Sequence, residues 1–305
     1  MTDPATIALF RLTPMSQENL LLDNVWVLRL DQAGGRAPGN KAFKLTEHLD
    51  RAREAGCEHI VSFGGAWSNH LHALAAVGAD MGLRTTGISR GGERSTPMLD
   101  DARAWGMELI PVSREEYRRR NQPAYLESIA ARFADGLVVP EGGGGACGVI
   151  GCQRIAAIIN RLNRHWRRVV VAVGTGTTLA GLASGLDCAE ELVGVSALKG
   201  APGLAADVER ALEEAGLTAR LPWEINHNFH AGGFARVSAS LRDFMLAFER
   251  GQALTLEPVY TGKAMYAIDA MRRSGAWLSS EPTLFVHTGG LQGRRGFDWL
   301  DQNCQ

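Results

Sequence analysis

Lys41 and Lys44 stand three positions apart in a chain that otherwise relies on arginine for positive charge. Of 32 basic residues only four are lysines, and the other two are Lys199 and Lys263. A lysine amine that loses its proton can attack a carbonyl carbon, whereas an arginine guanidinium stays protonated. The pair therefore indicates an amine that is needed for chemistry. A general depletion of lysine by coding bias is the alternative explanation.

The loop Gly174-Thr175-Gly176-Thr177-Thr178 has the composition of an anion site. It follows the β-branched run 168–173 and precedes a helix expected over 179–185. Glycines admit close backbone approach, N–H groups at a helix start attract an anion, and hydroxyls add donors. The glycine spacing differs from the dinucleotide fingerprint, and no lysine follows as in a P-loop. The loop predicts a site for a small phosphate group bound without metal, with a plain glycine turn as the alternative.

Three further polar segments stand at the ends of apolar runs. Ser68-Asn69 opens a helix expected over 69–81 and would serve equally well as its cap. The segments 259–263 and 287–290 are expected to be loops at a sheet edge. His70 and His72 do not share a helical face, so no metal site is predicted there.

The elements that position these residues follow from periodicity and from glycine punctuation. Asn40 is expected to cap a helix over 40–55, which places Lys41 in its first turn, where the helix dipole disfavours an ammonium. Strands alternate with helices along the chain and predict a doubly wound α/β fold of two domains, with parallel sheets covered by helices on both faces. The expected strands are 24–31, 59–63, 84–88, 108–112, 136–140, 168–173, 192–197 and 283–287. The further helices are 97–105, 122–133, 151–162 and 205–215.

Bulk properties narrow the class of partner. The 305 residues are 45% hydrophobic and 21% charged, with a formal net charge of −1, so nothing favours nucleic acid. The five cysteines are scattered, no leader or membrane-length apolar run is visible, and a cytoplasmic protein with reduced thiols is expected. The predicted partner is a small molecule.

A lysine in a helix first turn, a separate phosphate loop and hydroxyl-bearing loops together describe a pyridoxal phosphate site. The segments 39–45, 68–70, 174–178, 258–263 and 287–290 resemble, in this order, those of the 1-aminocyclopropane-1-carboxylate deaminase and D-cysteine desulfhydrase family. This family has the tryptophan-synthase-β-like fold, type II among pyridoxal phosphate enzymes. The resemblance implies two three-layer domains with the cofactor in the cleft between them, and a homodimer. The small domain would span 46–155, inserted into a large domain of 1–45 and 156–305.

The same resemblance implies roles for individual residues. Lys41 would hold the cofactor covalently and shuttle the substrate α-proton, with Lys44 and residues 174–178 near the phosphate. Asn69 would bond the ring hydroxyl, while Ser68 and Tyr260 would face the substrate. Either Thr261 or Thr288 would lie at the pyridine nitrogen.

The sequence departs from the family pattern at four places. Thr261 stands where the deaminases carry glutamate, as in the desulfhydrases, and Phe234 replaces an expected second tyrosine. Trp67 replaces a glutamine, and Gly144-Gly145 replaces a polar pair. A hydroxyl cannot keep the ring nitrogen protonated as a carboxylate can. The sequence therefore predicts a D-cysteine desulfhydrase-like α,β-elimination or related deamination of a small amino acid, giving a 2-keto acid and ammonia. The alternatives are aminocyclopropane-carboxylate deamination and cofactor binding with little turnover.

Overall fold

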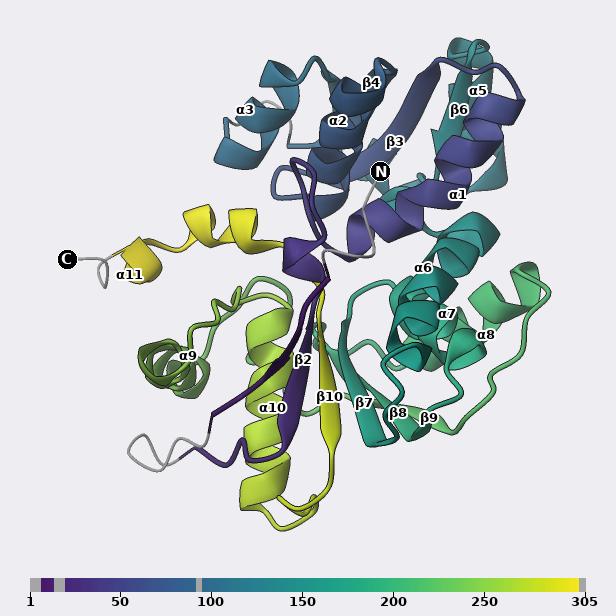
Figure 1. Ribbon diagram of the computed structural model, residues 1–305. Helices are drawn as coiled ribbons and strands as arrows, with labels where there is room; N and C mark the ends of the chain where they lie inside the picture. Colours follow the sequence, from purple (N-terminus) through teal and green to yellow (C-terminus); the bar gives the residue numbers. More distant parts are fainter. Residues whose placement is uncertain (1–6, 14–19, 92–94, 302–305) are drawn as a thin grey trace.

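The computed structural model describes residues 7–13, 20–91 and 95–301. In it the strands form two sheets, one of six strands and one of four. Figure 1 shows the six-stranded sheet in the lower half of the molecule and the four-stranded sheet in the upper half. The predicted α/β class with parallel sheets is confirmed, with a single antiparallel pair at one edge of the larger sheet.

The six-stranded sheet has the order β1-β2-β10-β7-β8-β9. Its strands are β1 Leu9–Arg11, β2 Val25–Arg29, β7 Trp166–Val173, β8 Ala189–Ser196, β9 Trp223–Asn226 and β10 Thr283–His287. Successive residues of β7 point to opposite faces, so Val169 and Val171 enter one hydrophobic core and Val170 and Ala172 the other. Both faces are therefore buried, as the continuous β-branched run predicts.

Helices cover the two faces of this sheet in separate groups. On one face lie α6 Gly145–Asn160, α7 Thr177–Gly185 and α8 Leu204–Glu214. On the other lie α9 Ala239–Gly251 and α10 Thr261–Arg273. The 3-10 helices η2 Leu30–Gln32 and η4 Leu291–Gly296 and the short helix α11 Asp298–Asp301 complete this part.

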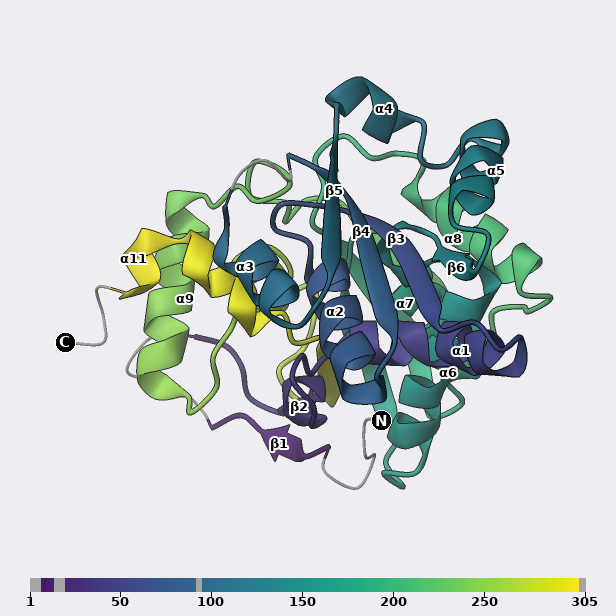
Figure 2. The same cartoon turned by 90° about the horizontal axis from the view of Figure 1, so that it is seen from above.

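The four-stranded sheet, with the order β5-β4-β3-β6, is parallel throughout. Its strands are β3 His59–Gly65, β4 Arg84–Arg90, β5 Glu108–Val112 and β6 Gly136–Val139. One face packs on α1 Asn40–Glu54, α2 Asn69–Met81 and α3 Pro97–Ala104. The other face packs on α4 Arg114–Arg118 and α5 Pro123–Arg132, and η3 Glu141–Gly143 follows β6. Figure 2 shows the four strands from above, with α2 and α4 on opposite sides.

The chain enters the smaller sheet through α1 and leaves it through α6, and these two helices pack against each other. The predicted boundaries, 45/46 and 155/156, fall inside these helices, so the division into domains stays a prediction. At the crossing, a Cβ on Gly151 would lie 2.2 Å from the Phe43 carbonyl oxygen. Glycine there lets the backbones of α1 and α6 approach closely.

Several sequence expectations are wrong in detail. Helices α4, α9 and α10 and strands β1 and β9 were not expected, and α6 begins at Gly145 instead of Gly151. The segment 259–263, expected to be a loop, contains the start of α10. Its polar residues are buried by tertiary contacts that a local pattern does not reveal. Four of the five cysteines are free thiols, and Cys304 lies outside the described residues. Within the described segments, no helix is long and apolar enough to cross a membrane.

The crossing of α1 and α6 gives a test of the packing. The change Gly151→Ala places a methyl group against the Phe43 carbonyl and should cost about 1–3 kcal/mol through overpacking. The matched change Gly203→Ala meets no heavy atom within 4 Å and should leave stability nearly unchanged. Thermal unfolding followed by circular dichroism should show a lower midpoint for Gly151→Ala alone. Equal midpoints would mean that the helices separate without cost.

Candidate functional site

The start of α1 is fixed by a close backbone contact with the turn after β10. Gly39 has a φ of 133° and is the N-cap, and a Cβ there would lie 2.5 Å from the Thr288 carbonyl oxygen. That same oxygen accepts a hydrogen bond of 3.1 Å from the Asn40 N–H. The expectation that Asn40 caps the helix is therefore wrong, because glycine alone fits the cap position. The Asn40 side chain instead donates to Thr178 Oγ1 at 2.9 Å.

Lys41 and Lys44 lie in the first turns of α1, as predicted. Lys41 Nζ donates to Asn40 Oδ1 at 3.3 Å, and Lys44 Nζ donates to Thr175 Oγ1 at 3.4 Å. Burial, followed by repulsion from Lys44, lowers the pKa of Lys41 to about 7. Burial also lowers the pKa of Lys44. Close to neutral pH, Lys41 is therefore available as a neutral amine.

The glycine-threonine loop, residues 174–178, joins β7 to α7 as expected. Gly176 is the N-cap of α7 with a φ of 82°. The hydroxyls of Thr175 and Thr177 lie 3.2 Å apart, next to Lys44 Nζ. Thr178 differs, because its hydroxyl bonds to α1 through Asn40. Lys44, two hydroxyls and the first N–H groups of α7 thus converge as donors.

Glu257 organises the start of α10 and was missed by the sequence interpretation. Its carboxylate accepts hydrogen bonds from the N–H groups of Val259, Tyr260 and Thr261, at 2.8, 2.6 and 2.7 Å. Burial raises the pKa of Glu257, while these amides oppose the rise. The available signal was an acidic residue within an apolar run just before a helix, where a carboxylate satisfies unpaired N–H groups.

Thr261 and Thr288 differ in the state of their hydroxyls. Thr261 Oγ1 accepts from the Glu257 N–H at 2.7 Å and donates to the Glu257 carbonyl at 3.3 Å. Thr288 is 8% exposed, and its hydroxyl has no partner within the described residues. A ligand atom would therefore find the Thr288 hydroxyl unengaged.

Tyr260 stands next to the glycine-threonine loop. A Cβ on Gly174 would lie 3.1 Å from the Tyr260 ring, so this glycine gives the phenol its place. Burial and the Glu257 carboxylate raise the pKa of Tyr260, which keeps it protonated at neutral pH. Phe234 packs edge-on against Tyr260 at 6.2 Å between ring centroids and is 52% exposed.

Lys263, another of the four lysines, holds the Phe234 segment in place. It is fully buried, and its Nζ donates to the carbonyls of Ala197 and Gly233 at 3.1 and 2.7 Å. Burial lowers the pKa of Lys263 to about 8. This amine joins the end of β8, the 233–234 turn and α10, so its contacts are structural.

Ser68 and Asn69 lie between β3 and the first turn of α2, and Asn69 bonds to the segment after β10. Ser68 is the N-cap of α2, because its hydroxyl accepts from the Leu71 N–H at 3.2 Å. Asn69 Oδ1 accepts from Gln292 Nε2 at 2.9 Å, and Asn69 Nδ2 faces Gly290. Gln292 was not anticipated, and it leaves Asn69 Nδ2 as the amide donor available to a ligand.

The two histidines of α2 have separate structural partners. Ser62 Oγ donates its hydrogen to the Val139 carbonyl at 2.7 Å. His70 Nε2 lies 2.7 Å from Ser62 Oγ and must therefore be the donor to that hydroxyl oxygen. His70 Nδ1 is then a buried acceptor without a partner in the described part of the chain, and it lies near Gly143. His72 Nε2 bonds to Asp101 at 2.9 Å. In the described segments, no three metal-ligating side chains gather.

Contacts within the protein are seen for two of the remaining departures from the family pattern, Trp67 and Gly144. Trp67 is 42% exposed and packs on Gly296, while the Gly144 carbonyl bonds to His48 Nε2 at 3.1 Å. Burial lowers the pKa of His48 to about 4, so this imidazole is neutral.

The donor set fits pyridoxal phosphate. Lys44, Thr175, Thr177 and the N–H groups of α7 suit a phosphate dianion, and Lys41 offers an amine of lowered pKa for a carbonyl carbon. Asn69 Nδ2 and the Thr288 hydroxyl remain for polar ring atoms. Every residue of this set comes from a segment that the sequence motifs single out.

Comparisons with known proteins agree with this chemistry. The sequence profile of the family described as "Pyridoxal-phosphate dependent enzyme" matches residues 8–289. A Thermotoga maritima protein, provisionally named 1-aminocyclopropane-1-carboxylate deaminase, is 30% identical over 88% of this chain and 89% of its own. A mitochondrial Arabidopsis thaliana protein, named bifunctional D-cysteine desulfhydrase/1-aminocyclopropane-1-carboxylate deaminase, is 27% identical over 91% of this chain and 74% of its own.

Solved structures share the fold. A crystal structure described as an ACC deaminase homologue superposes with a TM-score of 0.82 at 24% identity, covering 97% of this chain and 92% of the other. Threonine deaminase isoform 2 from Solanum lycopersicum gives a TM-score of 0.65 at 15% identity, covering 95% and 81%. The profile match spans most of the chain, and the chain therefore belongs to the pyridoxal-phosphate dependent enzyme family.

Proposed function

We propose that this enzyme catalyses a D-cysteine desulfhydrase-like α,β-elimination, or a related deamination, of a small amino acid to a 2-keto acid and ammonia. The observation that carries the proposal is the convergence of Lys44, Thr175 and Thr177 one turn of helix from Lys41, with the Tyr260 ring against the same loop at Gly174. The names of the Thermotoga and Arabidopsis relatives support the same class of reaction.

We propose that Lys41 holds the cofactor covalently and that Lys44, Thr175 and Thr177 bind its phosphate. The N–H groups of the glycine-threonine loop, Gly174 to Thr178, complete this phosphate site. Asn69 donates to the ring hydroxyl. Thr288 takes the pyridine nitrogen in preference to Thr261, because the Thr261 hydroxyl already makes two hydrogen bonds to Glu257. Bound pyridoxal phosphate supplies an electron sink next to the substrate α-carbon.

The protein residues then move and hold protons. Lys41 Nζ, released as a neutral amine when the substrate amine takes its place, would take the α-proton and hold it as an ammonium. Tyr260 Oη donates a hydrogen bond to the leaving side of the substrate, since its raised pKa keeps the proton on the oxygen. Ser68 orients the substrate through its hydroxyl, whose lone pair already caps α2.

Ring opening of 1-aminocyclopropane-1-carboxylate is the alternative reaction, and the names of the two relatives support it. Phe234 argues against it, because only one phenol, Tyr260, then faces this site. Binding of the cofactor with little turnover is the remaining alternative. We also propose a cytoplasmic homodimer, with the small domain spanning 46–155.

The attachment of the cofactor to Lys41 can be tested by spectroscopy. Purified protein should carry a visible absorbance band, and Lys41→Ala should abolish it because no other amine has the same position. Lys199→Ala changes an exposed lysine and should keep the band. A band that survives Lys41→Ala and disappears with Lys44→Ala or Lys263→Ala would refute the assignment.

The pH dependence of attachment follows from the lowered pKa of Lys41. Only the neutral amine reacts, so attachment to cofactor-free protein should accelerate about tenfold from pH 6 to pH 8 and then level off. An ordinary lysine, with a pKa near 10.5, would instead gain about 100-fold over this interval without a plateau. Stopped-flow absorbance, with Nα-acetyl-lysine measured in parallel as the ordinary amine, distinguishes the two curves. An unbroken rise to pH 9 would contradict the lowered pKa.

The reaction can be identified from its products. Pyruvate release from D-cysteine should exceed 2-ketobutyrate release from 1-aminocyclopropane-1-carboxylate, because the site lacks the second phenol. Phe234→Tyr restores that hydroxyl and should raise cyclopropane turnover, with general acid–base help worth up to about 10²–10⁴-fold.

Tyr260→Phe is the matched control for this experiment and should lower turnover. Wild-type turnover of the cyclopropane substrate that is unaffected by Tyr260→Phe would mean that both aromatic positions serve only packing. If neither keto acid is released, the result would favour the alternative that the protein binds the cofactor with little turnover.

A further inference from the structure

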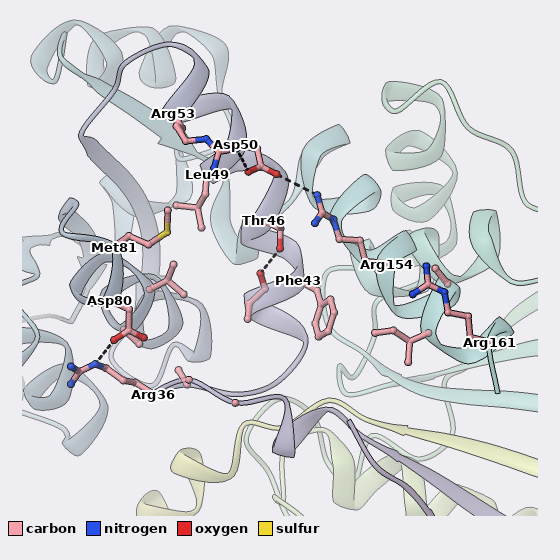
Figure 3. A pocket seen from close by; sticks show the side chains of 18 residues that line it. Arg36, Phe43, Thr46, Leu49, Asp50, Arg53, Asp80, Met81, Arg154 and Arg161 are labelled. Atoms are coloured by element: carbon pink, nitrogen blue, oxygen red, sulfur yellow. Dashed lines mark hydrogen bonds and ion pairs between the residues drawn. The ribbon is translucent and has the colours of Figure 1, made fainter. Parts of the chain in front are cut away.

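A groove of about 590 Å³ lies against α1 (Figure 3). Its walls come from α1, the end of α2, α6 and the loop of residues 34–37. The floor is apolar and includes Leu49, Val77, Ala157 and Ile158. This volume lies within the range of about 300–1,000 Å³ that is typical of small-molecule sites.

The groove is separate from the candidate site because α1 presents different faces to the two. Ala42, Thr46 and Leu49 line the groove, whereas Lys41 and Lys44 lie on the other side of the helix. The groove also spans α1 and α6, through which the chain enters and leaves the smaller sheet. A ligand here would contact both crossing helices at once.

Positive charge exceeds negative charge around this apolar floor. Four arginines line the groove, Arg36, Arg53, Arg154 and Arg161, against two aspartates, Asp50 and Asp80, which leaves two positive charges in excess. Arg36 pairs with Asp80 at 2.5 Å, and Asp50 is shared between Arg53 at 3.0 Å and Arg154 at 3.3 Å. Arg161 has no acidic partner in the described part of the chain.

The excess charge is concentrated on one face of α6 and on its C-cap residue, Arg161. Arg154, Ala157, Ile158 and Arg161 follow the spacing i, i+3, i+4 and i+7, which brings all four to the same side of the helix. Seven residues rise about 10.5 Å along a helix, so an apolar strip about that long separates the backbone positions of the two arginines. Figure 3 shows Arg154 and Arg161 on this side, facing Thr46 and Phe43 of α1.

We propose that this groove binds a small amphipathic anion, namely a monocarboxylate with an extended apolar chain. The carboxylate pairs with Arg161 or with Arg154, which shares the charge of Asp50 with Arg53. The apolar chain lies along Ala157 and Ile158. A neutral apolar molecule leaves the guanidinium groups uncompensated, and a small inorganic anion leaves the floor exposed to water. The inference does not depend on the reaction that the enzyme catalyses.

Calorimetric titration of the cofactor-loaded protein with octanoate tests the proposal. Saturable binding at one site is expected, with 1-octanol at least about tenfold weaker because it lacks the charge. Arg161→Gln and Arg154→Gln should each weaken octanoate by about tenfold, and Ala157→Trp should abolish binding by filling the groove. Arg118→Gln and Ala206→Trp change exposed residues outside the groove and should bind octanoate as the wild type does.

Three outcomes would overturn the proposal. They are no octanoate binding at millimolar concentration, equal binding of octanol, and unchanged binding by Ala157→Trp. Light scattering after size exclusion adds a fourth, because a wild-type dimer that Ala157→Trp converts to a monomer would make the groove an interface between two copies. Cofactor absorbance and circular dichroism identical to those of the wild type are required of each variant, so that a failed fold is not scored as lost binding.

Discussion

The contact between the first turn of α1 and the turn after β10 is the constraint on which the site depends. Gly39 lies so close to the Thr288 carbonyl that no side chain fits, and the Asn40 N–H bonds to the same oxygen. Because α1 is a single helix, fixing its start also fixes Lys41 and Lys44. The lysine positions are therefore set by a backbone contact between segments almost 250 residues apart in sequence.

Burial of like charges explains how an ordinary lysine becomes reactive. Removing an ammonium from water is costly, and a second ammonium close by adds repulsion, so the lysine gives up its proton more readily. Lys41 experiences both effects, while Glu257 opposes them from a distance. Glu257 itself is stabilised by three backbone N–H groups and also by the charge of Lys263. The same carboxylate accepts a hydrogen bond from the Tyr260 N–H, and its charge raises the pKa of both the Lys41 amine and the Tyr260 phenol.

The site combines residues from the segments around the smaller sheet with residues from those around the larger sheet. Asn69 at the start of α2 bonds to Gln292 after β10. The buried Nδ1 of His70 lies near Gly143. Lys263 holds the turn that carries Phe234 against Tyr260. The groove uses the opposite side of α1, so the helix that carries the reactive lysine is also a wall of a second surface.

The sequence by itself determined those features that are encoded locally. The β-branched run of β7, the glycine-threonine loop, the cap at Ser68 and the helical position of Lys41 each depend on neighbours within a few residues. Such signals predicted the fold class, and the order of the motifs predicted the cofactor that the family match supports.

Only the tertiary structure decided the features whose partners are distant in sequence. Asn40 bonds to Thr178 instead of capping its own helix, and α10 begins where a loop was expected because Glu257 satisfies its first N–H groups. The Thr288 hydroxyl has no partner among the described residues, whereas the Thr261 hydroxyl bonds to Glu257, and this difference likewise depends on folding. A hydrogen bond requires two groups to meet, and a linear pattern shows each group without showing which partner the fold brings to it.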